Sequence, residues 1–204
     1  MIAIIEYGVG NLYSLTCSFN TIGEEVVVTN DIKMLRKADK LLLPGVGAFG
    51  DAAEKLRASG LAEEIVAQAK AGKPLLGICL GMQLLFDKGY EYGEHEGLGL
   101  IQGSVRPISY AVPKGFKVPH MGWNKLDIGK GSRLLKYIKN GDYVYFVHSY
   151  YAAQCEENTV ATAEYGVPLT AVVEKGNIFG CQFHPEKSGS VGLEILRAFS
   201  ETKV

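Results

Sequence analysis

The stretch Pro74-Leu-Leu-Gly-Ile-Cys-Leu-Gly-Met-Gln-Leu-Leu-Phe86 joins a strand to a helix with no loop between them. Residues 74–78 are nearly all apolar, which is typical of a central parallel strand covered by helices on both faces. A short helix is predicted to follow at once, over residues 80–86. This pairing of a buried strand with a helix favours an α/β fold.

The segments before this stretch repeat the same alternation. Strands are predicted at residues 2–5, 26–28 and 40–43, and helices at residues 11–22, 51–57 and 61–71. Because strands alternate with helices in βαβ order, we expect a central, mostly parallel sheet with helices on both faces.

After Gly103 the pattern changes to short strand-like segments separated by Gly, Pro and Asn. They lie at residues 116–118, 143–148, 160–163, 170–173 and 177–183. We expect these segments to extend the sheet with antiparallel strands, and a last helix near residues 190–199 to close the chain.

Length and composition indicate one folded domain, residues 1–204. The 204 residues are 47% apolar and 21% charged and carry a net charge of -1, which disfavours disorder and nucleic-acid binding. The N-terminus lacks a basic leader, no apolar run approaches the ~18 residues that span a bilayer, and the cysteines form no CxxC pair. A soluble protein of the reducing cytoplasm, with neither a zinc site nor a disulfide framework, is therefore expected.

The sequence Gly77-Ile-Cys-Leu-Gly81 has the form of a nucleophile elbow, a sharp turn between a strand and a helix. Glycines on both sides of Cys79 avoid collisions with neighbouring backbone, and a helix N-terminus stabilises a thiolate. The alternative is that Cys79 is a small buried residue, as free cysteines usually are. The motif by itself leaves both interpretations open.

The sequence Phe183-His-Pro-Glu186 supplies a base and a carboxylate two residues apart. In extended backbone both side chains project to the same face, so the Glu186 carboxylate can orient His184 toward a nucleophile. Alone, the motif is more typical of a surface turn. Together with Cys79 it completes the nucleophile, base and orienting acid of acyl transfer.

The sequence Pro44-Gly-Val-Gly47 follows another predicted parallel strand, at the edge of the sheet where Cys79 is expected. Its N–H groups, with the N–H of Leu80, are suited to bind an oxyanion, because glycine allows the peptide to reorient. An ordinary strand-to-helix turn explains these glycines equally well.

Two other patterns are rejected. The sequence Gly8-Val-Gly10 lacks the third glycine of a dinucleotide fingerprint, since Tyr13 stands in its place. His95, His120 and His148 have no metal-ligand spacing, so no catalytic metal is expected.

Three ordered motifs, at residues 44–47, 77–83 and 183–186, resemble those of the triad (class I) glutamine amidotransferases. Within that family, residues 6–12, 119–124 and 146–151 are similar to the glutaminase subunits of imidazole glycerol phosphate synthase, from histidine biosynthesis. The likeness covers essentially the whole chain. It implies a flavodoxin-like amidotransferase fold and hydrolysis of L-glutamine to glutamate and ammonia, with no cofactor.

The resemblance also implies roles for single residues. The catalytic triad would be Cys79, His184 and Glu186, and the oxyanion donors Gly47 and Leu80. Residues expected at the glutamine pocket are Gln83, Glu91, His148, Ser149 and Tyr150. A heterodimer is expected with a separate (β/α)8 barrel cyclase subunit, through which ammonia passes to a nucleotide. The residues expected to contact that cyclase are Asn11, Met121, Trp123, Asn124 and Lys187.

Other functions share parts of this pattern. A cysteine peptidase or thioesterase would use the same elbow without needing Gln83 or a docking face. Glutaminases of anthranilate-type or pyridoxal-phosphate-type synthases would differ in their partner. Because a free glutaminase would waste glutamine, we expect the chain alone to be nearly inactive until a ligand-bound partner reorients residues 45–47.

Overall fold

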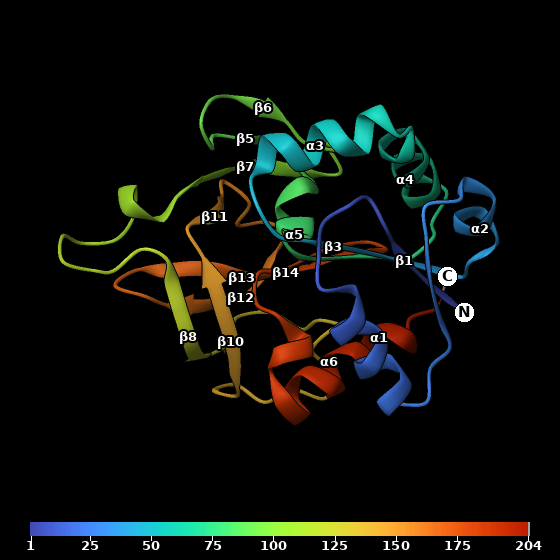
Figure 1. The fold of residues 1–204 in the computed structure, drawn as a ribbon. Coiled ribbons are helices and arrows are strands. Elements are labelled where there is room, and N and C mark those ends of the chain that lie inside the picture. Colours follow the sequence, from blue (N-terminus) through green and yellow to red (C-terminus); the bar gives the residue numbers. More distant parts are fainter. Residues whose placement is uncertain (204) are drawn as a thin grey trace.

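The computed structural model describes residues 1–203, and its centre is an eight-stranded sheet (Figure 1). The strand order is β2-β1-β3-β4-β14-β13-β12-β9. In that order the bounds are Val26–Thr29, Ile2–Ile5, Lys40–Gly45, Leu75–Cys79, Ile178–Cys181, Pro168–Lys175, Thr159–Glu164 and Asp127–Ile128. The strands predicted near the N-terminus are confirmed, with ends shifted by one or two residues.

The first five strands in this order, from β2 to β14, all pair in parallel. The remaining three, β13, β12 and β9, pair antiparallel. The parallel order is that of flavodoxin-like sheets, in which ligands bind beyond the carboxyl ends of the strands. The predicted fold class, a mostly parallel sheet with an antiparallel extension, is confirmed.

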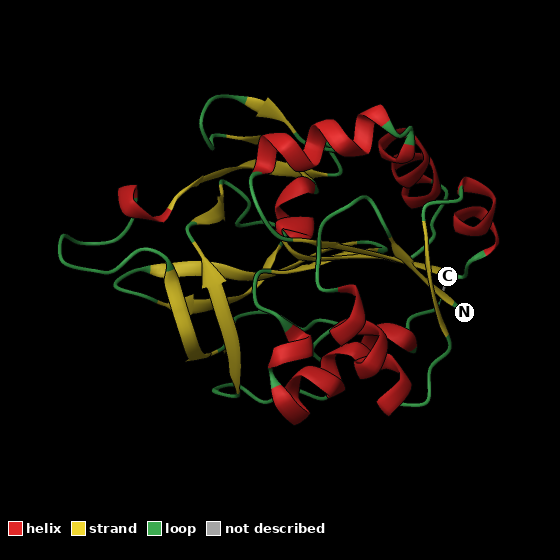
Figure 2. Cartoon of the chain, in the orientation of Figure 1, coloured by secondary structure: helices red, strands yellow, loops and turns green. Residues whose placement is uncertain are grey.

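Helices cover both faces of this sheet (Figure 2). On one face lie α1 (Leu12–Thr21) and α6 (Gly189–Ser200), and on the other lie α2 (Ile32–Lys37), α3 (Phe49–Ala58), α4 (Leu61–Lys70) and α5 (Leu80–Leu84). Strand β1 shows why two cores form: Ala3 and Ile5 pack into the core under α3 and α4, whereas Ile2 and Ile4 pack into the core under α1 and α6. Alternate side chains of a strand point to opposite faces, so a strand covered on both sides must be apolar throughout.

Two smaller sheets stand beside the large one. One pairs β8 (His120–Lys125) with β10 (Tyr143–His148), and the other has the order β11-β7-β5-β6. The bounds of the latter four are Tyr150–Ala153, Ile101–Pro107, Phe86–Gly89 and His95–Glu96. Single turns of 3-10 helix occur at η1 (Ile108–Tyr110) and η2 (Pro185–Lys187).

Four details of the prediction are wrong. Residues 143–148 pair with β8 outside the central sheet, because β8 supplies a partner for the whole strand. Residues 177–183 include a strand parallel to β4, because the tight turn at Gly176 sets β14 antiparallel to β13. Residues 116–118 form no strand; all three are exposed and precede Pro119, which has no N–H to donate. The helix predicted to reach residue 86 ends at Leu84, because Phe86 begins β5.

Within residues 1–203, no helix has the length and apolar character that crossing a membrane would require.

Candidate active site

The turn at Cys79 is strained. Its backbone has φ 54° and ψ -112°, a region that residues with a side chain rarely adopt. A Cβ atom on Gly77 would lie 2.6 Å from the Gly81 carbonyl oxygen, and a Cβ atom on Gly81 would lie 1.8 Å from the Leu43 carbonyl oxygen. The two glycines are therefore required by contact with backbone, and the turn aims Cys79 beyond the carboxyl end of β4.

His184 and Glu186 form a buried pair. His184 Nδ1 and Glu186 Oε1 lie 2.8 Å apart, and the two side chains are only 4% and 1% exposed. Glu186 Oε2 is also buried and has no hydrogen-bond partner among residues 1–203, so His184 alone holds the carboxylate. The extended backbone predicted for this contact is wrong, because residues 185–187 form one turn of 3-10 helix and Pro185 begins that turn.

The charge state of His184 depends on its neighbours. Burial is the largest single influence and lowers the pKa of His184, but Cys79 and Glu186 together raise it to about 10. Negative charge on either neighbour favours the imidazolium form. At neutral pH the arrangement therefore favours the imidazolium form of His184 beside Cys79.

The backbone of His184 is held by the β8–β10 sheet. Its N–H donates to the Tyr145 carbonyl over 2.9 Å. The Ser188 hydroxyl donates to the His184 carbonyl over 2.7 Å and accepts from the Tyr145 N–H over 2.9 Å. Ser188 was not among the predicted site residues, because no local motif distinguishes it from an ordinary serine before a helix.

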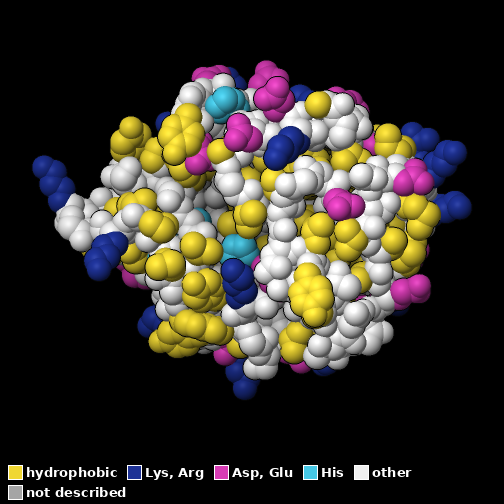
Figure 3. Space-filling view, viewed as in Figure 1, with side chains coloured by type: hydrophobic (Ala, Val, Ile, Leu, Met, Phe, Trp, Pro, Cys, Tyr) yellow, Lys and Arg dark blue, Asp and Glu magenta, His cyan; other side chains and the backbone are white. Residues whose placement is uncertain are grey.

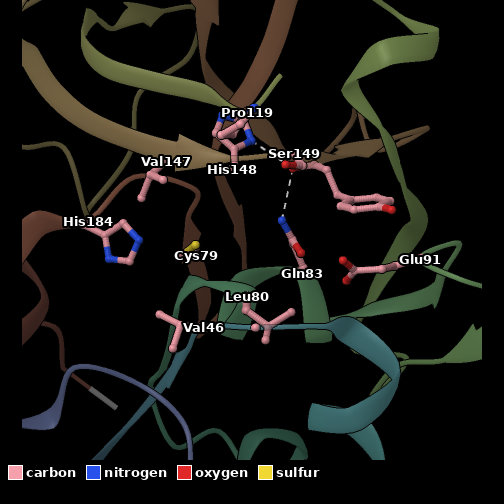
Figure 4. Close-up of a pocket in the computed structure, with 12 residues that line it drawn as sticks. Val46, Cys79, Leu80, Gln83, Glu91, Pro119, Val147, His148, Ser149 and His184 are labelled. Carbon is pink, nitrogen blue, oxygen red and sulfur yellow. Dashed lines mark hydrogen bonds between the residues drawn. The ribbon is translucent and has the colours of Figure 1, made fainter. Parts of the chain in front are cut away.

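Cys79 and His184 share one cavity, with a volume of about 360 Å³ (Figure 4). This volume lies at the lower end of the usual range for small-molecule sites. The lining residues are Val46, Gly47, Cys79, Leu80, Gln83, Glu91, Pro119, Val147, His148, Ser149, Tyr150 and His184.

The Gly-rich loop forms one wall of this cavity. Gly45 lies opposite Cys79 in the β3–β4 register, and Gly47 has φ 103° with open space where a Cβ atom would be. The Tyr7 hydroxyl donates to the Pro44 carbonyl over 2.7 Å and holds the start of the loop. The loop is thus fixed at Pro44, and at Gly47 it adopts a left-handed backbone conformation that favours glycine.

Comparison with known proteins identifies the family. The sequence model of "Glutamine amidotransferase class-I" matches residues 3–201. This chain belongs to the class I glutamine amidotransferase family. It is therefore a glutaminase-type enzyme, as the motifs predicted.

Relatives of this amidotransferase are similar along their whole length. The imidazole glycerol phosphate synthase subunit HisH of Caldanaerobacter subterraneus subsp. tengcongensis is 52% identical, over 98% of both chains. The subunit of the same name from Lactococcus lactis subsp. lactis is 50% identical, again over 98% of both chains.

Solved structures show the same fold at low identity. The crystal structure of a glutamine amidotransferase matches with a TM-score of 0.77 at 18% identity, over 98% of both chains. The structure of PurLQS from Thermotoga maritima matches with a TM-score of 0.73 at 21% identity, over 98% of this chain and 96% of that one.

The residues expected at the glutamine pocket of this amidotransferase all line the cavity. Glu91 reaches it from the loop after β5, and its Oε2 accepts from the Phe49 N–H over 2.7 Å at the start of α3. Gln83 is buried on α5, and its Nε2 donates to the Tyr150 carbonyl over 3.1 Å. Backbone groups thus hold the Glu91 carboxylate and the Gln83 amide in place, and Figure 4 shows both side chains at the cavity.

His148 belongs to a buried pair of histidines. Its Nδ1 lies 2.8 Å from the Tyr150 carbonyl oxygen, and its Nε2 lies 3.0 Å from His120 Nδ1. Burial lowers the pKa of His148 to about 3 and that of His120 to about 4. The imidazoles of His120 and His148 are therefore neutral at physiological pH. The Tyr150 carbonyl can only accept, so the proton of His148 lies on Nδ1.

Gln182 was missed by the sequence analysis. It has no exposed surface, and its Nε2 donates to Cys79 Sγ with an N···S distance of 3.7 Å. A polar residue inside the otherwise apolar run from Ile178 to Phe183 is the signal that would have found it.

The residues expected at a partner interface lie at three elements, β8, η2 and the start of α1. On β8, Met121 is 65% exposed and Trp123 is 56% exposed, so Trp123 fills no core gap. Asn124 follows on the same strand, and Lys187 is exposed on η2, after His184. Asn11 lies before α1, where its Oδ1 accepts from the Ser14 N–H over 3.4 Å.

Proposed function

We propose that this chain is the glutaminase subunit of imidazole glycerol phosphate synthase and that it releases ammonia from L-glutamine at Cys79. The observation that carries the proposal is a cysteine elbow sharing one cavity with a buried His–Glu pair, in a chain about half identical to HisH subunits along its whole length. A peptidase or thioesterase would explain the elbow, but it would not explain the similarity to HisH subunits along the whole chain.

The proposed reaction begins with attack of the Cys79 thiolate on the side-chain amide carbon of glutamine. His184, protonated, gives its proton to the amide nitrogen, and ammonia leaves. A γ-glutamyl thioester remains on Cys79. Water then loses a proton to His184 and attacks the thioester, which releases glutamate and restores the thiolate.

The N–H groups of Gly47 and Leu80 are the proposed donors to the oxyanion. Two features support them: both residues line the cavity, and Leu80 is the first residue of α5, where N–H groups have no partner inside the helix. Glu186 acts through His184, because its Oε1 holds Nδ1 and leaves Nε2 free for the reaction.

Substrate binding is assigned by charge. The Glu91 carboxylate is the one acidic group that lines the cavity within residues 1–203, and we assign it to the α-ammonium group of glutamine. Gln83, His148, Ser149 and Tyr150 form the remaining polar wall. Their backbone and side-chain groups would bind the carboxylate and the side-chain amide of the substrate.

The proposed partner is a (β/α)8 barrel cyclase, in a heterodimer that passes ammonia to the cyclase nucleotide. One face of the β8–β10 sheet supports this assignment. Antiparallel pairing puts Met121 beside Val147 and Trp123 beside Tyr145, and the two rings meet edge to face with centroids 6.0 Å apart. Exposed apolar side chains gather here on the lower left of Figure 3, and such patches are typical of protein interfaces.

The docking face continues into the cavity, because Val147 belongs to both. Lys187 and Asn11 would add polar contacts around the apolar centre. Asn124 alternates to the opposite face of β8, where its Nδ2 donates to the Glu164 carbonyl over 2.8 Å. We also propose that the chain folds as one domain and acts in the cytoplasm. The second proposal is supported by its four cysteines, all of which are free thiols.

The experiment is to measure glutamate formation from L-glutamine by the chain alone and after addition of the cyclase subunit and its nucleotide. We expect slow release by the chain alone, a large increase in the mixture, and imidazole glycerol phosphate formed without added ammonia. Equal rates with and without the cyclase, or no glutamine-dependent product, would contradict the proposed partner.

A further inference from the structure

Within residues 1–203, Gln182 is the one buried polar side chain in contact with Cys79 Sγ that the proposed mechanism leaves without a role. It directly follows β14 and has 0% exposure. Its Nε2 donates to Cys79 Sγ over 3.7 Å, within the range of hydrogen bonds to sulfur. His184, two residues further along the chain, also lines the cavity, but its side chain pairs with Glu186.

The orientation of the Gln182 amide is set by a backbone group. Amide oxygen and nitrogen are hard to distinguish by shape, so the hydrogen-bond network must assign them. The Tyr150 carbonyl can only accept, and it accepts from Gln83 Nε2 over 3.1 Å, at the dashed line that begins at Gln83 in Figure 4. The same Nε2 donates its second hydrogen to Gln182 Oε1 over 3.0 Å, which leaves Gln182 Nε2 facing the sulfur.

A donor in this position matters because of the charge on sulfur. A thiolate accepts hydrogen bonds far better than a thiol, so a fixed N–H group stabilises the ionised form. The contact is buried, and there a hydrogen bond to a charged group is stronger than in water. Gln182 is uncharged and cannot lose its proton, so it donates at every stage of the reaction, whereas His184 gives up and regains its proton.

We propose that Gln182 is a further catalytic residue, which donates a hydrogen bond to Cys79 Sγ and stabilises the thiolate both as nucleophile and as the leaving group of thioester hydrolysis. This inference rests on the proposed function of Cys79. In the second step the C–S bond breaks and its electron pair returns to sulfur, while His184 holds the proton taken from water. The Gln182 N–H group then stabilises the negative charge that returns to the sulfur.

The test uses Gln182→Met, which keeps the length of the side chain and removes the donor, and Gln182→Glu, which keeps the shape and replaces the donor by an acceptor. Gln102→Met, at an exposed position, is the matched control. Alkylation of Cys79 by iodoacetamide is followed against pH on the full chain by mass spectrometry of the peptide that contains it, since the exposed Cys17 also reacts. The other titratable neighbours of Cys79, namely His184, Tyr7 and Cys181, are unchanged in these variants.

We expect Gln182→Met to move the alkylation midpoint up by about one pH unit and to lower kcat for glutamate release with the cyclase by ~10-fold, the usual effect of losing a hydrogen bond to a charged group. Gln182→Glu should lower kcat further than Gln182→Met does. Gln102→Met should leave both the alkylation midpoint and kcat unchanged. If both Gln182 variants melt like the wild type and keep its alkylation profile and kcat, the inference is wrong. A change confined to KM would overturn it as well, because it would make Gln182 a wall of the glutamine pocket. Glutamate release by Cys79→Ala in the same assay would instead contradict the proposed function itself.

Discussion

The imidazole of His184 lies between a sulfur and a carboxylate, and its charge is set by both. The Glu186 carboxylate holds Nδ1 from a position with only 1% exposure. In Glu186→Gln the amide cannot carry the charge that favours the imidazolium, so kcat should fall by about 10²-fold or more while KM changes little. Glu194→Gln, on the exposed side of α6, is the matched control. Steady-state kinetics with glutamine decide the matter; a raised KM at unchanged kcat would make Glu186 a binding residue.

The neutral histidine pair predicts how stability depends on pH. Burial lowers the pKa of His120 to about 4, below the ~6.5 of an unfolded histidine, so the unfolded chain binds more protons between these values. This contribution to the free energy of unfolding is fully present above pH ~6.5 and is lost as pH falls toward about 4.

In His120→Phe the ring still stacks on Tyr165 and Phe146, whose centroids lie 4.1 and 4.9 Å from that of His120, but it no longer titrates. We expect the stability of this variant, measured by urea unfolding at several pH values, to fall less steeply in acid than that of the wild type. An unchanged slope would show that protonation of His120 does not contribute.

At this scale the sequence predicted the reacting groups better than their supports. Cys79 and His184 stand in motifs whose spacing carries chemical meaning. Gln182 and Ser188 act through contacts with residues far away in the chain, and such contacts depend on strand order rather than on local pattern. Only the polarity of Gln182 inside the apolar run from Ile178 to Phe183 gave a local signal.

Between β4 and α5, the elbow depends on close packing of backbone against backbone. A Cβ atom on Gly81 would meet the Leu43 carbonyl oxygen at 1.8 Å, so α5 or β3 would have to move. Gly81→Ala should therefore lower the free energy of unfolding by ~1–3 kcal/mol or more. Gly129→Ala, where a Cβ atom would have open space, is the control. Wild-type stability of Gly81→Ala in denaturant would contradict this account of the turn.

Elements that bury both faces were predictable, and elements defined by tertiary pairing were not. Strands such as β1 and β4 are apolar runs because helices cover both sides. Helix α2 was missed because it has only six residues, three of them basic, and its clearest signal is the Asp31 cap, which accepts from the Lys33 N–H over 2.8 Å. The parallel pairing of β14 with β4 could not be predicted either, because it depends on the turn at Gly176 and on strand order, not on residue type.

For the whole molecule, the main expectation is an interface on the β8–β10 face. Trp123 is 56% exposed and rests on Tyr145, so it adds little to the fold of the isolated chain. Trp123→Ala should weaken binding of the cyclase by ~10-fold or more and leave the free energy of unfolding almost unchanged. Tyr137→Ala removes an aromatic ring that is 46% exposed outside this face, and should bind like the wild type. Titration calorimetry measures the affinity of both variants for the cyclase. If Trp123→Ala binds as tightly as the wild type, the interface does not lie on this face.

Release of ammonia from glutamine at Cys79 is tested by the rate of glutamate release by Cys79→Ala in complex with the cyclase. Cys17→Ala, at an exposed cysteine, serves as the control. We expect no enzymatic glutamate from Cys79→Ala, with its fold and cyclase binding retained, and the wild-type rate from Cys17→Ala. Glutamate release by Cys79→Ala at a rate near that of the wild type would contradict ammonia release at Cys79.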